Sequence, residues 1–386
     1  MSTDLDGPLE GGAFGETPLL AAVRRRDRAA IEALLRAGAN INQKSHWWAG
    51  GFHVLDGAWD TAWLAPFLIE RGAVPEIHHL VQLEKFDDVA HVLAADPGAV
   101  HARGGDGHTP LHEARSIAMA ELLLRHGADV NARDVDHEST PAQYMVRDRQ
   151  PIARFLIERG AATDILMTAA LGDRDRTAAT LDADPGTIRT IVSDAYFPMR
   201  DRRAGGTIYN WTLGSDKSPH EVARDFGHGD LVAYLMSRSP LDVKLAAACE
   251  LGDAALVDRI LAANPQAGTL MREDYRRLPA AARNNKTVTV ELMVKAGWPV
   301  AARGPENATA LHWAAFHGNP AMVQALLDAG ADPAVRGDVH DATPLDWARH
   351  GSQHGWQSRT GDYAGVYHLL RPNAAQGRQN QPDSDQ

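Results

Sequence analysis

Short helical patterns recur along the chain in one fixed order. A threonine opens a segment that carries one or two alanines, a polar turn follows, and a second segment carries a Leu-Leu pair and ends at glycine. Residues 16–42, 108–132 and 308–333 show this order. Threonine before proline is typical of a helix N-cap, and glycine after the last apolar pair fits a left-handed C-cap. The pattern predicts pairs of short helices joined by tight turns.

The pairs recur at a nearly constant interval. The closing glycines are 34 residues apart between Gly38 and Gly72, and 33 residues apart between Gly297 and Gly330. One such pair cannot bury its own apolar face, so neighbouring pairs must stack to form a core. A period of 20–50 residues is typical of repeat architectures.

The Thr-Pro-Leu-His steps, the alanine pairs, the Leu-Leu pairs and the Gly-Ala markers resemble the ankyrin repeat, in particular divergent, His- and Trp-rich bacterial ankyrin chains with insertions. The resemblance implies an all-α solenoid of about eleven stacked helical hairpins with short β-turn fingers. It also implies binding, usually of another protein, on the fingers and the concave groove. Three shorter units, at 75–97, 164–185 and 241–265, are interpreted as hairpins with trimmed fingers.

The domain prediction follows from where the repeats begin and end. We expect a flexible segment over 1–15, a single solenoid over 16–370 and a disordered tail over 371–386, which is rich in Gln, Asn and Asp. Alternating bulky and polar residues around Gly205-Gly206 predict that 187–216 is an inserted β-hairpin. Such an insertion serves either as a lid over the groove or as a docking element for a partner.

Net charge, apolar runs and cysteine content limit the kinds of partner and site that we expect. The net charge of −11, from 39 basic and 50 acidic residues, argues against nucleic acid as a ligand. No apolar run is long enough to cross a membrane. The acidic start lacks the apolar stretch of a secretory signal, so we expect a cytoplasmic protein. The single cysteine, Cys249, excludes an internal disulfide and a zinc cluster made of cysteines.

The second unit departs from the repeat through its aromatic residues. Trp47 and Trp48 precede His53 and Asp56, and they indicate either a plug at the end of the stack or an aromatic small-molecule pocket. His53 and Asp56 are three positions apart and offer two metal ligands, which is too few. We therefore predict no metal and no cofactor.

Acid–imidazole neighbours occur in three fingers: Asp106 with His108, Asp136 with His137, and His340 with Asp341. Such neighbours suit general acid–base work, but Asp is also an ordinary turn former. The histidines of the Thr-x-Leu-His steps, His112 and His312, have a simpler interpretation, because the resemblance implies that they hydrogen-bond neighbouring backbone.

The leading hypothesis is a recognition scaffold that binds a protein or peptide in an aromatic, His-rich groove. The alternative is an enzyme or small-molecule-binding protein in the same groove, covered by 187–216, with His53, Asp56, Asp136 and His137 as catalytic candidates. The residues predicted to line the groove are Trp47, Trp48, His53, Asp56, His108, Asp136, Tyr196, Tyr209, Trp211, Trp313, His317, Asp341 and Trp356.

Overall fold

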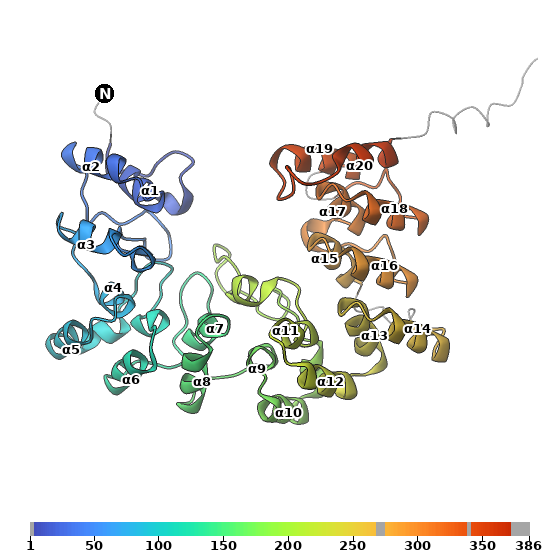
Figure 1. Ribbon diagram of the computed structural model, residues 1–386, viewed down its shortest axis with the longest axis horizontal. Helices are drawn as coiled ribbons and strands as arrows, with labels where there is room; N and C mark the ends of the chain where they lie inside the picture. The colour runs from blue at the N-terminus through green and yellow to red at the C-terminus, as the bar shows by residue number, and fades with distance from the viewer. Residues whose placement is uncertain (1–3, 268–274, 338–340, 372–386) are drawn as a thin grey trace, which may run out of the picture. The chain divides into compact units, whose positions relative to one another are not determined.

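The computed structural model describes residues 4–267, 275–337 and 341–371. The chain forms two compact units, Met1–Lys217 (unit 1) and Ser218–Gln386 (unit 2) (Figure 1). All regular elements of the described residues are helical, as the resemblance implied. His340 and the tail predicted beyond residue 371 lie outside the described residues. The flexible N-terminal segment, the number of repeats and the single solenoid over 16–370 stay predictions.

Unit 1 contains α-helices and short 3-10 or π turns, labelled η. They are η1 (Ala13–Gly15), α1 (Pro18–Arg24), α2 (Arg28–Arg36), η2 (Ala58–Asp60), α3 (Leu64–Ile69), α4 (Ile77–Gln82), α5 (Phe86–Ala95), η3 (Pro97–His101), η4 (Pro110–Glu113), α6 (Ile117–Arg125), α7 (Pro141–Met145), α8 (Gln150–Glu158), α9 (Ile165–Leu171), α10 (Arg174–Ala183), η5 (Pro185–Arg189) and η6 (Asn210–Gly214).

Unit 2 continues the alternation of short helices. They are α11 (Pro219–Asp225), α12 (Gly229–Arg238), α13 (Leu241–Glu250), α14 (Ala254–Ala263), α15 (Arg277–Arg283), α16 (Thr287–Lys295), η8 (Pro305–Asn307), α17 (Ala310–Phe316), α18 (Pro320–Asp328), α19 (Pro344–His354) and α20 (Tyr363–Leu370). Helices α15, α17 and α19 pack in one row and α16, α18 and α20 in another (Figure 1). No helix of the described chain is both long enough and apolar enough to cross a bilayer.

Local sequence explains where these helices begin and end. Thr17 caps α1 by accepting a hydrogen bond from the Leu20 backbone N–H at 3.3 Å, and Pro18 occupies the first helical position. Asp164 caps α9, whose seven residues are all buried, and Gly172 ends that helix in the left-handed region at φ 65°. Both N-caps are therefore formed by a side chain that accepts a backbone N–H within the first helical turn.

Imidazoles join each of several first helices to the next finger. His112 accepts the Thr109 backbone N–H at Nδ1 (3.1 Å) and donates from Nε2 to the Ser139 carbonyl oxygen (3.1 Å). His312 likewise donates from Nε2 to the Ala342 carbonyl oxygen at 3.1 Å. The structural role expected for these two histidines is confirmed.

The β-hairpin predicted over 187–216 is absent, although the structure describes this whole segment. The two ends of the segment are joined at its base, where the Val192 N–H donates to the Lys217 carbonyl oxygen and the Asp216 N–H donates to the Val192 carbonyl oxygen. Farther along, backbone N–H groups donate to the finger of residues 134–139 instead: Gly205 to the Asp136 carbonyl oxygen at 3.0 Å, and Arg200 to the Glu138 carboxylate at 2.7 Å. Because these donors are used elsewhere, no hairpin ladder forms. We call residues 190–217 the insertion loop.

A buried ion pair holds the start of unit 2 together. Arg277 Nη1 lies 2.6 Å from Glu250 Oε1, and the Ser218 hydroxyl donates to Glu250 Oε2 at 2.7 Å. The side chains of Arg277 and Glu250 are 4% and 6% exposed, so water does not screen this contact. Burial raises the pKa of Glu250, but the guanidinium outweighs burial and holds this pKa below its ordinary value.

Replacing Arg277 by Met leaves the Glu250 carboxylate buried without its main cation, and we expect a loss of about 3–5 kcal/mol of unfolding free energy. Urea unfolding followed by circular dichroism measures it. The matched control is Lys295→Met, which removes the cation of the half-exposed pair with Asp258 and should cost less than ~1 kcal/mol. Equal losses in the two variants would contradict the assignment.

The same ion pair predicts a pH dependence of stability. Since the folded-state pKa of Glu250 is lowered, its contribution is complete above the ordinary pKa of the carboxyl group and is lost as the pH falls through the folded value. The stability difference between the wild type and Glu250→Gln should shrink as the pH falls below about 4.5. A difference that grows on acidification would contradict this sign.

Candidate functional site

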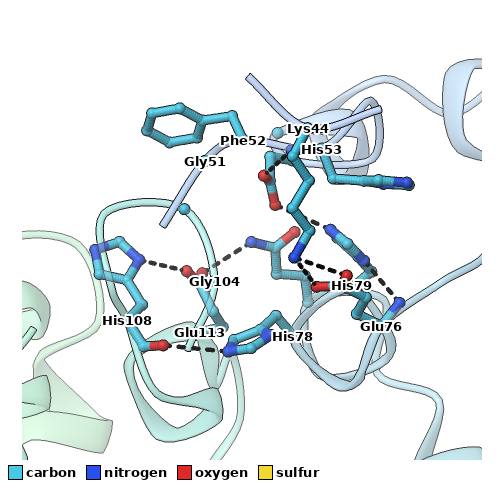
Figure 2. Close-up of a pocket in the computed structure, with 14 residues that line it drawn as sticks. Lys44, Gly51, Phe52, His53, Glu76, His78, His79, Gly104, His108 and Glu113 are labelled. Atoms are coloured by element: carbon cyan, nitrogen blue, oxygen red, sulfur yellow. Dashed lines mark hydrogen bonds and ion pairs between the residues drawn. The ribbon is translucent and has the colours of Figure 1, made fainter. Parts of the chain in front are cut away.

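A small polar pocket lies in unit 1, where α4, η4 and the loop before η2 meet (Figure 2). Its volume is about 140 Å³. Its walls combine imidazoles, carboxylates, one lysine and glycine backbone: Lys44, Gly51, Phe52, His53, Asp56, Gly57, Glu76, His78, His79, Gln82, Gly104, Gly105, His108 and Glu113. The predicted residues His53, Asp56 and His108 belong to it.

Asp56 is held by two donors from the pocket wall. One carboxylate oxygen accepts the His79 Nε2–H at 2.9 Å, and the other accepts the His53 backbone N–H at 2.6 Å. His79 accepts the Glu76 backbone N–H at Nδ1 (2.9 Å), which fixes its tautomer. The Asp56 carboxylate therefore links the loop before η2 to the first turn of α4.

His53 is neutral at ordinary pH. Its Nδ1 accepts the Leu55 backbone N–H at 3.3 Å, its Nε2 donates to Asn42 Oδ1 at 3.2 Å, and its side chain is buried. Burial lowers the pKa of His53 to about 4, and the neighbouring His79 adds to the effect. Although His53 and Asp56 are close, the imidazole does not contact the carboxylate through a hydrogen bond.

The third pocket wall holds a charged pair that sequence reasoning missed. His108 Nδ1 lies 2.8 Å from Glu113 Oε1, and Gln82 donates to the other carboxylate oxygen at 2.9 Å (Figure 2). His108 Nε2 lies 3.0 Å from the Tyr144 hydroxyl. Burial lowers the pKa of His108, but the Glu113 carboxylate outweighs burial and raises it. Glu113 follows the Thr-Pro-Leu-His step directly, and that position was its only sequence signal.

Asp106 accepts a hydrogen bond from a tryptophan. The Trp47 indole Nε1–H donates to Asp106 Oδ1 at 2.9 Å, and the Trp47 ring contacts Phe14 edge-on at a centroid distance of 5.1 Å. The Arg203 guanidinium lies over the Trp48 ring, 4.3 Å from the ring centroid. The two tryptophans thus connect the N-terminal segment, a finger and the insertion loop.

Asp106 also approaches Asp136 and His137 of the next finger. One ligand atom from each of the three residues lies within 4.8 Å of the others. Asp136 Oδ2 is 3.5 Å from His137 Nε2, and both residues are buried. The exposed Trp211 ring covers His137 at a centroid distance of 4.6 Å. Two carboxylates and an imidazole are groups that hold a metal ion.

Unit 2 contains an aromatic pocket of about 420 Å³ between α17, η8 and α19. The Trp313 ring is nearly parallel to Trp356 at a centroid distance of 6.2 Å, and it meets Trp347 at 84° and 5.0 Å. The pocket is lined by Glu306, Trp313, Phe316, Ala342, Asp346, Trp347, His350 and Trp356. We call this the unit 2 aromatic pocket.

The other predicted residues of unit 2 differ in how far their side chains are exposed to solvent. Trp313 is 2% exposed and its indole N–H has no hydrogen-bond partner, whereas Trp356 is 66% exposed at the same pocket. His317 donates from Nε2 to the Arg283 carbonyl oxygen at 2.7 Å and is buried. Asp341 is exposed.

The two predicted tyrosines of the insertion loop have different environments. Tyr209 is fully buried, and its hydroxyl donates to the Asp164 carboxylate at 2.7 Å. Tyr196 is 44% exposed. Within unit 1 the structure thus brings together Trp47, Trp48, Asp106, Asp136 and Trp211 and leaves Tyr209 in the core.

Comparison with known families decides the classification. A family model described as ankyrin repeats in three copies matches residues 244–337, and the single ankyrin repeat model matches 14–46 and 106–135. This chain contains ankyrin repeats. The matched stretches include both the Asp106 finger of unit 1 and the α17 region of unit 2.

Two proteins that are similar to this chain are much longer than it is. The chain is 24% identical over 281 residues to the ankyrin repeat and KH domain-containing protein mask-1 of Caenorhabditis elegans, covering 69% of this chain and 9% of that protein. It is 36% identical over 107 residues to the palmitoyltransferase AKR1 of Lachancea kluyveri, covering 26% and 14%. The chain therefore spans a small part of these relatives.

Among solved structures, the ankyrin repeat domain of Bcl-3 is similar at 20% sequence identity. The match covers 72% of this chain and 94% of that chain, with a TM-score of 0.25.

Substitutions of Asp56 test whether the hydrogen bonds around the pocket of Figure 2 stabilise the fold. Asp56→Ala removes the acceptor of both His79 and the His53 backbone, and we expect a loss of about 2–3 kcal/mol of unfolding free energy. Asp56→Asn keeps an acceptor oxygen for the neutral His79 N–H and should cost less. Glu70→Ala is the control, because the Glu70 side chain is 75% exposed and its contact with Arg71 is long. Urea denaturation of the four proteins gives the comparison, and an Asp56→Ala protein as stable as the control would refute a structural role.

Proposed function

We propose that this ankyrin-repeat protein is a recognition module and that its unit 2 aromatic pocket binds a cationic side chain of a protein or peptide. Ankyrin repeats generally mediate interactions between proteins, which supports the class of partner. The observation that carries the proposal is an exposed tryptophan, Trp356, at a pocket whose other walls are Trp313, Phe316 and Trp347.

The ring geometry suits a cation. The faces of aromatic rings are electron-rich, so a cation is attracted to a site over one or more ring faces. Trp313 and Trp356 are nearly parallel, while Phe316 meets Trp356 at 83° and a centroid distance of 5.5 Å. Rings in these two orientations present both faces and edges to one small volume.

Charge at the pocket favours the same ligand. Glu306 and Asp346 line it with carboxylates, and the whole chain carries a net charge of −11. Asp346 also caps α19 through Thr343 and lies 3.1 Å from Arg349, so Glu306 is the more available carboxylate. A neutral apolar anchor would gain nothing from these groups, whereas Lys or Arg would gain from both rings and carboxylates.

The enzyme alternative needs acid–imidazole pairs that are open to a substrate. His53 and Asp56 are committed to hydrogen bonds with backbone and neighbouring side chains, and His108 is paired with Glu113. Only the contact between Asp136 and His137 favours other chemistry. Recognition is therefore the function that the described geometry supports best.

Titration of tryptophan fluorescence with N-acetyl-arginine amide and N-acetyl-lysine amide tests the proposal, with N-acetyl-norleucine amide as the uncharged probe. We expect the cationic probes to bind more tightly, and Trp356→Ala to weaken their binding by about 5- to 30-fold, the range of one partly desolvated cation–π contact. Trp356 is mostly exposed, so this variant should keep its helical circular dichroism signal.

The matched control is Val288→Ala, which truncates a 57% exposed side chain of unit 2 outside the pocket and should leave probe binding unchanged. Equal affinity for the charged and uncharged probes, or unchanged binding by Trp356→Ala, would refute a cation pocket.

A further inference from the structure

We propose that Asp106, Asp136 and His137 of unit 1 form a binding site for a divalent transition-metal ion such as Zn²⁺. The three residues come from two successive fingers, residues 104–108 and 134–139, and the insertion loop contacts the second finger. One ligand atom from each lies within 4.8 Å of the other two. The site is separate from the unit 2 aromatic pocket and does not rest on the function proposed for it.

The tautomer of His137 presents a free ligand atom. Its Nδ1 lies 2.8 Å from the Gly206 carbonyl oxygen, which is only an acceptor, so Nδ1 carries the proton. In the neutral imidazole Nε2 is then an unprotonated acceptor, and it faces Asp136 Oδ2 at 3.5 Å. His112, by contrast, uses its protonated Nε2 to bind backbone. A ring N–H bound to a carbonyl oxygen is the usual arrangement of metal-binding histidines.

Two acceptors that face each other at 3.5 Å repel unless a positive charge, either a cation or a proton, lies between them. Asp136 is 4% exposed, and its Oδ1 has no hydrogen-bond partner. No Lys or Arg of the described chain forms an ion pair with Asp136 or Asp106. A carboxylate buried in this way is costly unless it is paired or coordinates a metal.

One of the three ligand–ligand distances matches the dimensions of a coordination sphere. The 3.5 Å between Asp136 Oδ2 and His137 Nε2 is close to the edge of a tetrahedron with ligand bonds of about 2.1 Å. A Cβ on Gly205 would lie 3.0 Å from Asp136 Oδ2 and 3.2 Å from His137 Cε1, so glycine gives these ligands room to move. The Trp47 indole N–H orients Asp106 from outside at 2.9 Å.

The ligand set identifies the class of ion. One imidazole nitrogen and two carboxylate oxygens suit Zn²⁺, Mn²⁺, Fe²⁺ or Co²⁺, and they lack the six to eight oxygen ligands that Ca²⁺ takes. Asp106 is partly exposed and Trp211 is 57% exposed, so solvent reaches this side of the cluster. Water then completes the coordination.

The test uses the full-length, tag-free chain after dialysis against a chelator. Isothermal titration with Zn²⁺ should show one site per chain that is lost in Asp136→Asn and His137→Gln, each weakening binding by at least about 100-fold. Titration with Co²⁺ should produce visible absorption bands of a coordinated ion and quench tryptophan fluorescence, because Trp47, Trp48 and Trp211 lie next to the ligands.

His79→Gln is the matched control. It removes another buried imidazole bonded to a carboxylate in unit 1, but one whose Nε2 is already committed to Asp56, so Zn²⁺ affinity should stay unchanged. Circular dichroism confirms the fold of each variant, and Asp136→Asn preserves the shape of the side chain. Absence of a stoichiometric site, or a site that survives in both ligand variants, would overturn the proposal and leave a shared proton as the bridge.

Discussion

The hydrogen bond from an imidazole of one repeat to the finger of the next is the contact on which the rest of this structure depends. His112 and His312 form it with the same atoms, Nδ1 accepting from the capping threonine and Nε2 donating to a carbonyl oxygen. His78 donates in the same manner to the Ala102 and His108 carbonyl oxygens. These bonds fix the fingers, and the fingers position the polar side chains of unit 1. A single helical pair cannot bury its own apolar face. This contact holds it against the next pair and fixes how the two pairs are aligned.

His137 differs from these histidines in the ring nitrogen that donates to a carbonyl oxygen. It lies in the finger itself, its Nδ1–H is taken by Gly206 of the insertion loop, and its bare Nε2 faces Asp136. The same finger receives backbone hydrogen bonds from the loop. A cation bound here would connect two fingers while the loop orients one of the ligands. The insertion and the acid–imidazole cluster are thus parts of one arrangement.

Structural features that depend on contacts between residues a few positions apart were predictable from the sequence. The Thr17 cap follows from a neighbour three positions away. The roles of His112 and His312 were implied by the resemblance to the ankyrin repeat, because their acceptors, the Ser139 and Ala342 carbonyl oxygens, lie 27 and 30 residues away. The β-hairpin prediction was wrong because the partners of the loop backbone lie in residues 134–139, more than 60 positions earlier. Sequence alternation cannot show that a donor is used by a distant finger.

The candidate sites were predictable only in part, for the same reason. Asp136 and His137 were named as a pair, but Asp106, their third partner, belongs to the preceding finger, and the tautomer of His137 depends on a carbonyl 69 residues away. Trp313 and Trp356 were expected in a groove. Their shared pocket with Phe316 and Trp347 depends on how α19 packs on α17, which the sequence does not show.

Long-range ¹H–¹⁵N correlation spectra of the histidine side chains test the central claim most directly, because they distinguish the two imidazole tautomers. His112 should show a protonated Nε2 and an unprotonated Nδ1 that persist on mild acidification, since burial lowers its pKa to about 3. His137, in metal-free protein, should show the opposite tautomer. A His112 imidazole that becomes charged near pH 6.5, or that carries its proton on Nδ1, would contradict the account.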